Sequence, residues 1–226
     1  MRGQALDAVP VDGVPNVVSS GDALFTVNSA PGTRVYDEEL CTVGAVEYRR
    51  WDPARSKLAA YLLLGGPELV LSEDSRMLYL GAASGTTASH VADILSRGVV
   101  YCVEVSQRSF RDLLRVCESR PNMIPILADA ESPEQYDHMV AAVDFLYQDI
   151  AQRLQVDIFM KNLRHFDVRE GMLMVKSRSI DVSRDPAEVY GRVRGRLSAQ
   201  GLRIRSVVDL RRYSRDHAAM LVGAGD

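Results

Sequence analysis

Short apolar runs alternate with stretches of helical periodicity along most of this 226-residue chain, and no other feature constrains its fold as strongly. The apolar runs beyond residue 70 occupy residues 77–80, 99–105, 123–127, 143–147 and 172–175. Because they are continuous rather than alternating in polarity, they are typical of strands buried on both faces of a parallel sheet. Between and after them, helices are predicted over residues 86–95, 108–118, 134–142, 155–166 and 186–198. The sequence therefore predicts an α/β fold built on a mostly parallel sheet.

The N-terminal part departs from this alternation. Residues 24–27 and 34–36 look extended and lie among prolines and glycines, which predicts a small β-rich domain over residues 1–50. The Asp-Pro pair at 52–53 is predicted to be the N-cap and first residue of a helix. That helix would open a second domain over residues 51–226.

The C-terminal part carries a different signal. Apolar residues 202–208 and 218–222 are joined by a brief, polar, Arg-rich connection. This spacing predicts a hairpin, so we expect one antiparallel strand in the otherwise parallel sheet.

The stretch from Arg76 to His90 contains a glycine-rich turn between a strand and a helix. Gly81 and Gly85 would allow a tight turn and a close approach to a ligand, and the helix that follows would offer free N–H groups. The stretch lacks the lysine of a P-loop, and Ala83 replaces the middle glycine of the dinucleotide-binding motif. Many α/β proteins have such a turn for packing alone, so this motif is weak by itself.

Acidic residues at the next two strand ends strengthen the prediction of a ligand site. Glu104 lies 19 positions after Gly85, where a carboxylate can bind both ribose hydroxyls of an adenosine. Asp129 ends the third strand and could accept a hydrogen bond from the adenine amino group. Each alone is typical of a solvated loop acid, but together with the turn they favour an adenosine-containing cofactor. Without a phosphate-binding lysine, S-adenosylmethionine fits better than ATP or NAD.

Four further residues are candidates for chemistry at the same edge. Asp149 and Lys176 end the fourth and fifth strands, so they should face one crevice. Lys57 and His217 are the other candidates. Taken alone, Lys57 is typical of an exposed lysine on a helix, and His217 of a core histidine that hydrogen-bonds the backbone. The chain contains 24 arginines and only three lysines. Codon bias toward arginine explains this background, but in such a chain we expect a lysine where an amine that can lose its proton is needed.

Charge and composition limit the class of protein. The net charge is −3, but residues 1–160 hold 13 basic and 22 acidic side chains whereas residues 161–226 hold 14 and 8. The negative net charge argues against a protein that binds nucleic acid by itself. The basic C-terminal portion indicates that an anionic partner could bind one side of the protein. Three dispersed cysteines and no membrane-spanning apolar run predict a protein of the cytosol with no metal site and no membrane contact.

Several long blocks resemble the fibrillarin family, and its archaeal fibrillarin-like RNA 2′-O-methyltransferases in particular. The blocks follow the family's order and occupy residues 48–60, 79–87, 124–130, 147–152, 176–182 and 215–217. The resemblance runs from about Val35 to the end and lacks the eukaryotic Gly/Arg-rich tail. Arg153 stands where the family usually has proline, and Val105 where it often has an aromatic residue.

The resemblance implies a Rossmann-like class I methyltransferase fold, with a mostly parallel seven-stranded sheet and one antiparallel strand, behind a small β-rich domain. It implies a catalytic set of Lys57, Asp149, Lys176 and His217. It also implies S-adenosylmethionine binding by Gly81, Ala82, Ser84, Gly85, Thr86, Thr87, Glu104, Val105, Asp129, Ala130, Asp149, Ile150, Ala151 and Gln152.

The implied reaction is methyl transfer to ribose 2′-oxygens of rRNA or tRNA, in an archaeal cytosolic ribonucleoprotein. Its partners would be a box C/D guide RNA, the target RNA, a Nop-domain scaffold and, indirectly, a kink-turn-binding ribosomal-like protein. We hypothesise that Lys176 is the general base, its pKa lowered by the nearby Lys57, with Asp149 orienting it and with Lys57 and His217 steadying the oxyanion. The alternatives are a protein (glutamine) methyltransferase and an inactive assembly module with the same fold.

Overall fold

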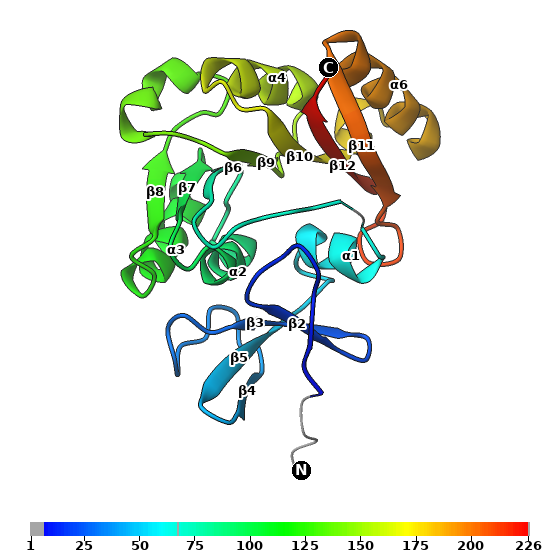
Figure 1. The fold of residues 1–226 in the computed structure, drawn as a ribbon. Helices are drawn as coiled ribbons and strands as arrows, with labels where there is room; N and C mark the ends of the chain where they lie inside the picture. The colour runs from blue at the N-terminus through cyan, green and yellow to red at the C-terminus, as the bar shows by residue number, and fades with distance from the viewer. Residues whose placement is uncertain (1–6, 67, 226) are drawn as a thin grey trace.

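A seven-stranded sheet forms the centre of the computed structural model, which describes residues 7–66 and 68–225 (Figure 1). The strand order is β11-β12-β10-β9-β6-β7-β8. The strands are β6 (Arg76–Leu80), β7 (Val99–Glu104), β8 (Met123–Leu127), β9 (Phe145–Gln148), β10 (Glu170–Lys176), β11 (Leu202–Asp209) and β12 (His217–Ala224). Only β12 runs against its neighbours, pairing antiparallel with both β10 and β11. The predicted α/β sheet with one antiparallel strand is confirmed.

A second, smaller sheet precedes it in the chain and is entirely antiparallel. Its order is β1-β2-β3-β5-β4. The strands are β1 (Val9–Pro10), β2 (Val17–Ser20), β3 (Ala23–Val27), β4 (Leu40–Val43) and β5 (Val46–Trp51). The prediction of an extended piece over residues 34–36 is wrong. The backbone N–H groups of Val35 and Tyr36 donate to the Glu38 carboxylate at 2.8–3.0 Å, so this segment forms a loop around that side chain.

Helices cover both faces of the large sheet. They are α1 (Lys57–Leu63), α2 (Thr86–Ile94), α3 (Gln107–Glu118), α4 (Gln155–His165), α5 (Ser177–Ile180) and α6 (Pro186–Ala199). Helices α1 to α3 lie between the two sheets, and α4 and α6 cover the opposite face (Figure 1). The large sheet is therefore buried on both faces, which is why its strands are continuous apolar runs.

Two sequence predictions about helices are wrong. Residues 134–142 form no α-helix but two 3₁₀ turns, Pro133–Gln135 and Asp137–Met139. Tyr136 separates them with a φ of −131°, since its ring is buried and its hydroxyl hydrogen-bonds the Asn162 side chain. The first helix starts later than expected: Ser56, not Asp52, is the N-cap, and its hydroxyl accepts from the Ala59 N–H at 3.3 Å. The Asp-Pro pair lies in the preceding turn.

Buried charges join the small sheet to α2. The Arg49 guanidinium on β5 forms 2.6 Å ion pairs with Glu38 and with Asp93 of α2. Arg120 adds a third ion pair, 3.2 Å from Asp93. Beside them, His90 of α2 is fully buried and stacks on Trp51. Because α2 begins at the glycine-rich turn, this network fixes the helix that leads away from that turn.

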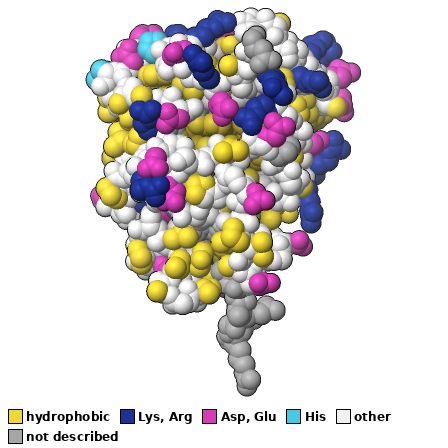
Figure 2. Space-filling model, in the orientation of Figure 1, with side chains coloured by type: hydrophobic (Ala, Val, Ile, Leu, Met, Phe, Trp, Pro, Cys, Tyr) yellow, Lys and Arg dark blue, Asp and Glu magenta, His cyan; other side chains and the backbone are white. Residues whose placement is uncertain are grey.

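The surface repeats the uneven charge of the sequence. Figure 2 shows Lys and Arg side chains gathered over the part of the molecule that holds α4, α6, β11 and β12, and apolar side chains over the small sheet. No helix within residues 7–66 and 68–225 is long and apolar enough to cross a membrane.

Candidate active site

The carboxyl ends of the parallel strands surround a cavity of about 290 Å³. It is lined by Gly81, Ala83, Val103, Glu104, Val105, Ala128, Asp129, Ala130, Asp149, Ile150, Ala151, Gln152, Ile158 and Lys176. Ligands of open α/β sheets bind at this edge. The cavity is therefore the candidate ligand site.

The two glycines of the turn have different roles. Gly81 has a φ of +83°, and a Cβ there would lie 2.6 Å from the Asp149 carbonyl oxygen. Gly85, with a φ of +88°, is the N-cap of α2, and its Cβ would meet Leu113 of α3 at 3.0 Å. Only glycine fits both positions without strain. Gly81 brings β6 close to the end of β9, whereas Gly85 allows α2 and α3 to pack.

Glu104 connects two loops of the cavity. Its Oε2 accepts from the Ala83 N–H at 2.8 Å, and its Oε1 accepts from the Ser106 N–H at 2.7 Å. The side chain is almost completely buried yet lines the cavity. Two backbone donors thus fix the carboxylate and leave its remaining lone pairs for hydroxyl donors of a ligand.

Asp149 lies between two lysines at the end of β9. Its Oδ2 is 2.9 Å from Lys57 Nζ, and its Oδ1 is 3.2 Å from Lys176 Nζ. Burial by itself raises the pKa of Asp149, but the charges and hydrogen bonds of both lysines outweigh that effect and lower the pKa below its usual value. The site therefore holds an ionised carboxylate that pairs with both lysines. Lys57, which the resemblance placed in this set but the strand-end pattern did not, joins it from the start of α1.

His217 joins this set from the antiparallel strand. It is the first residue of β12 and is the register partner of Lys176 on β10. Its Nδ1 donates to the Arg215 carbonyl oxygen at 2.5 Å, which leaves Nε2 as an acceptor. Burial lowers the pKa of His217 below 6.5, and the charges of Lys57 and Lys176 lower it further against the effects of the Arg215 carbonyl and Asp149. The ring is neutral at pH 7.

Some of the predicted cofactor residues line the cavity and others do not. Nine line the cavity: Gly81, Glu104, Val105, Asp129, Ala130, Asp149, Ile150, Ala151 and Gln152. The other five do not line it and form the rest of the turn and the start of α2: Ala82, Ser84, Gly85, Thr86 and Thr87.

Sequence reasoning missed four residues that line the cavity. Ala83 lies inside the glycine-rich turn and has a φ of +50°. Val103 directly precedes Glu104 and Ala128 directly precedes Asp129, so their places beside the two predicted acids could have identified them as cavity residues. Ile158 comes from α4, and nothing in the sequence pattern points to it.

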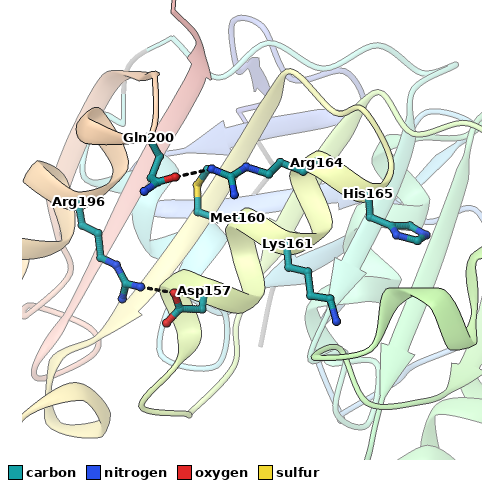
Figure 3. A pocket seen from close by; sticks show the side chains of 7 residues that line it. All are labelled: Asp157, Met160, Lys161, Arg164, His165, Arg196 and Gln200. Carbon is teal, nitrogen blue, oxygen red and sulfur yellow. Dashed lines mark hydrogen bonds and ion pairs between the residues drawn. The ribbon is translucent and has the colours of Figure 1, made fainter.

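A larger cavity, about 450 Å³, lies between α4 and α6 (Figure 3). Its cations are already paired within the chain: Arg196 with Asp157, Arg164 with Gln200, and Lys161 with Glu134. It lies on the outer helical layer rather than at the strand ends. Two of these pairs join α4 to α6 and its C-cap, and the third joins α4 to the turn Pro133–Gln135, so the candidate site for chemistry is the smaller cavity.

No group of three His, Cys, Asp or Glu side chains suited to a metal ion occurs in the described part of the chain. Burial raises the pKa of Cys102 well above its usual value, and that thiol lies in the core as expected.

A sequence model of the Fibrillarin family matches residues 10–225. The chain belongs to the fibrillarin family. It is 48% identical over 214 residues to the fibrillarin-like rRNA/tRNA 2′-O-methyltransferase of Methanothermobacter thermautotrophicus, covering 94% of this chain and 96% of that protein.

Solved fibrillarins share the fold. Aeropyrum pernix fibrillarin with natively bound S-adenosyl-L-methionine superposes with a TM-score of 0.82 at 44% identity, covering 96% of this chain and 99% of that one. The fibrillarin of a fibrillarin/Nop5p complex gives 0.84 at 41% identity, covering 92% and 97%. The Rossmann-like methyltransferase fold is confirmed.

Proposed function

We propose that this fibrillarin transfers a methyl group from S-adenosylmethionine to ribose 2′-oxygens of rRNA and tRNA, the reaction for which its archaeal relatives are named. The observation that carries the proposal is the convergence of Lys57, Lys176, Asp149 and His217 at one end of the cavity. A hydroxyl nucleophile needs a proton acceptor and charge stabilisation, and these residues supply both.

The cavity fits the cofactor. Asp149 Oδ1 is buried and faces Lys176 Nζ at 3.2 Å, so one of its lone pairs remains for a second donor such as the cofactor's amino group. Glu104 would bind the ribose hydroxyls, and Asp129 the adenine amino group. Gly81 keeps the Asp149 backbone within reach because no Cβ intervenes. When bound, S-adenosylmethionine supplies an electrophilic methyl group.

His217 is the better candidate than Lys176 for the base that takes the hydroxyl proton. Both lysines form ion pairs with Asp149 and so present N–H donors, not a free amine lone pair. His217 is neutral, its Nδ1 proton is committed to the Arg215 carbonyl, and its Nε2 is an acceptor. This assignment replaces the hypothesis that Lys176 is the base and His217 steadies the oxyanion.

The two lysines then act on the developing negative charge. As the hydroxyl loses its proton, its oxygen becomes anionic, and fixed ammonium groups in a partly buried site stabilise that charge. Asp149 holds both at 2.9 and 3.2 Å and limits their motion. Orientation of hydroxyl and methyl group supplies much of the remaining acceleration.

Partners follow from the same relatives. A related fibrillarin assembles with Nop5p, and we propose that a Nop-domain scaffold likewise docks this chain beside a box C/D guide RNA and its target. The acidic N-terminal portion, net −9 over residues 1–160, supports dependence on partners for RNA delivery. A kink-turn-binding protein would contribute indirectly, through the guide.

Reconstitution tests the proposal. The chain should methylate an RNA only when a complementary guide and the scaffold are both present, and changing the guide should move the methylated nucleotide. Methylation of protein glutamine without guide RNA would favour the protein-methyltransferase alternative. Cofactor binding without transfer to any guide-matched RNA would favour the assembly-module alternative.

A further inference from the structure

Two exposed arginines at the edge of the active site have no partner in the described part of the chain. Arg153 directly follows the cavity residue Gln152, and Arg215 precedes His217 by two positions. No ion pair or hydrogen bond of either guanidinium occurs among residues 7–66 and 68–225.

The neighbouring arginines differ because their charges are already used. Arg178 lies 3.3 Å from the Asp216 carboxylate and donates to two backbone carbonyls. Arg211 pairs with Asp209, and Arg212 lies over the ring of its neighbour Tyr213. Arg153 and Arg215 therefore provide free positive charge at this edge.

Their elements place these arginines on two sides of the catalytic set. Arg153 is in the loop after β9, and Arg215 is in the connection from β11 to β12. Strands β9 and β12 are the two neighbours of β10, at whose end Lys176 lies. The strand end that carries Lys176 is thus flanked by one unpaired arginine on each side.

We propose that Arg153 and Arg215 bind the phosphates on either side of the target nucleotide. This inference rests on the proposed function, because a ribose whose 2′-oxygen reaches His217 carries one phosphate toward each neighbouring nucleotide. Arginine suits this role since its planar guanidinium donates two parallel hydrogen bonds to phosphate oxygens. The two residues are positioning residues for RNA, and they lie outside the cofactor and proton-transfer groups.

The test uses Arg153→Gln, Arg215→Gln and the double variant in the particle assembled with scaffold and guide. Arg203→Gln is the matched control, because Arg203 is exposed, has no ion pair in the described chain and lies at the opposite end of the sheet. We expect the KM for target RNA to rise several-fold in each single variant and further in the double variant. Cofactor affinity should stay as in the control in every variant, and kcat at saturating RNA should stay as in the control in Arg153→Gln.

Salt dependence gives a second readout. Each lost phosphate contact should reduce the slope of log affinity against log salt by about 0.7 to 0.9. An unchanged KM and slope in the double variant would overturn the proposal. Weaker binding to the scaffold without RNA would also overturn it and identify an acidic protein surface as the partner.

The same experiment separates this proposal from the proposed function. Turnover of the unsubstituted chain on guide-matched RNA reports the function. If that turnover is absent, the RNA affinities and salt slopes of the variants still show whether Arg153 and Arg215 contact RNA phosphates.

Discussion

The ionised state of Asp149 and the neutral state of His217 each have an identified cause. Asp149 is kept ionised by Lys57 and Lys176, which both pair with its carboxylate. His217 is kept neutral by burial and by the same lysines. The site thus contains two donors and one acceptor before substrate arrives, which is the arrangement that deprotonation of a hydroxyl requires.

Replacement of His217 by glutamine should lower kcat about 10²- to 10⁴-fold, the usual contribution of a positioned base. Cofactor affinity, measured by calorimetry, should not change, because His217 does not line the cofactor cavity. His138→Gln is the control, since His138 is exposed in the turn Asp137–Met139.

The pH profile distinguishes His217 from Lys176. A base must be unprotonated, so kcat of the unsubstituted chain should fall as the pH falls through the pKa of His217, which lies below 6.5. This acidic limb should disappear in His217→Gln and persist in Lys176→Arg. The opposite pattern, with the limb retained in His217→Gln, would return the role of base to Lys176.

Replacement of Glu104 by glutamine should weaken cofactor binding roughly tenfold, with the fold retained. One carboxylate oxygen would become an NH₂ group that cannot accept from the Ala83 or Ser106 N–H, and one acceptor for a ribose hydroxyl would be lost. Calorimetry measures this, with Glu118→Gln on the exposed side of α3 as control. An affinity equal to that of the control would remove Glu104 from the site.

At the level of elements, strand ends determine the site. The turn after β6 and the end of β9 approach so closely that a Cβ at Gly81 would lie 2.6 Å from the Asp149 carbonyl oxygen. Any side chain there must displace either the turn that lines the cavity or the backbone of Asp149. Packing of these two segments therefore links the shape of the cavity to the position of the Asp149 carboxylate.

Gly81→Ala should consequently lower cofactor affinity and kcat together and destabilise the chain by roughly 1–3 kcal/mol, since its φ of +83° also strains alanine. Gly191→Ala is the matched control: no atom lies within 4 Å of a Cβ on this helical glycine, so that change should stabilise α6 by up to about 1 kcal/mol. Thermal unfolding and calorimetry test both. Full cofactor affinity in Gly81→Ala would contradict the close packing.

The elements also show how far sequence reasoning reaches. Continuous apolar runs identified strands β6 to β10, because strands covered on both faces of a sheet are apolar along most of their length. The helix predicted over residues 134–142 failed because the burial of Tyr136 and its bond to Asn162 are long-range effects. Asp149 and Lys176 were placed together by the strand-end rule. The position of Lys57 required the packing of α1, which no local pattern encodes.

At the scale of the whole molecule, the two sheets are joined through buried polar groups. His90 hydrogen-bonds Thr26 through Nδ1 and Tyr36 through Nε2, both at 2.8 Å. Burial lowers the pKa of His90 well below 6.5, and the charges of Arg49 and Arg120 act in the same direction. The contact between the small sheet and α2 therefore depends on a neutral imidazole.

This contact should make folding stability sensitive to pH. Because the folded pKa of His90 is depressed, the unfolded chain binds the proton first, and stability is lost as the pH falls below 6.5. The loss should be about 1.4 kcal/mol per pH unit in urea unfolding. His90→Asn should flatten that slope in part, since His217 contributes in the same direction. An equally steep slope in the variant would contradict the role of His90.

The charge division of the whole chain is consistent with an enzyme that acts within an assembly. Residues 1–160, net −9, supply every lining residue of the cavity except Lys176, whereas residues 161–226 are basic, and Lys and Arg side chains gather over the part of the surface that holds them (Figure 2). The central claim is that the reacting atom is a ribose 2′-oxygen.

The most direct test is nucleoside mass spectrometry of two target RNAs treated with the assembled particle, one natural and one with a 2′-deoxy sugar at the target nucleotide. We expect 2′-O-methylation of the natural nucleotide and no methylation of the deoxy target. A methyl group on the base, or equal methylation of the deoxy target, would contradict the account.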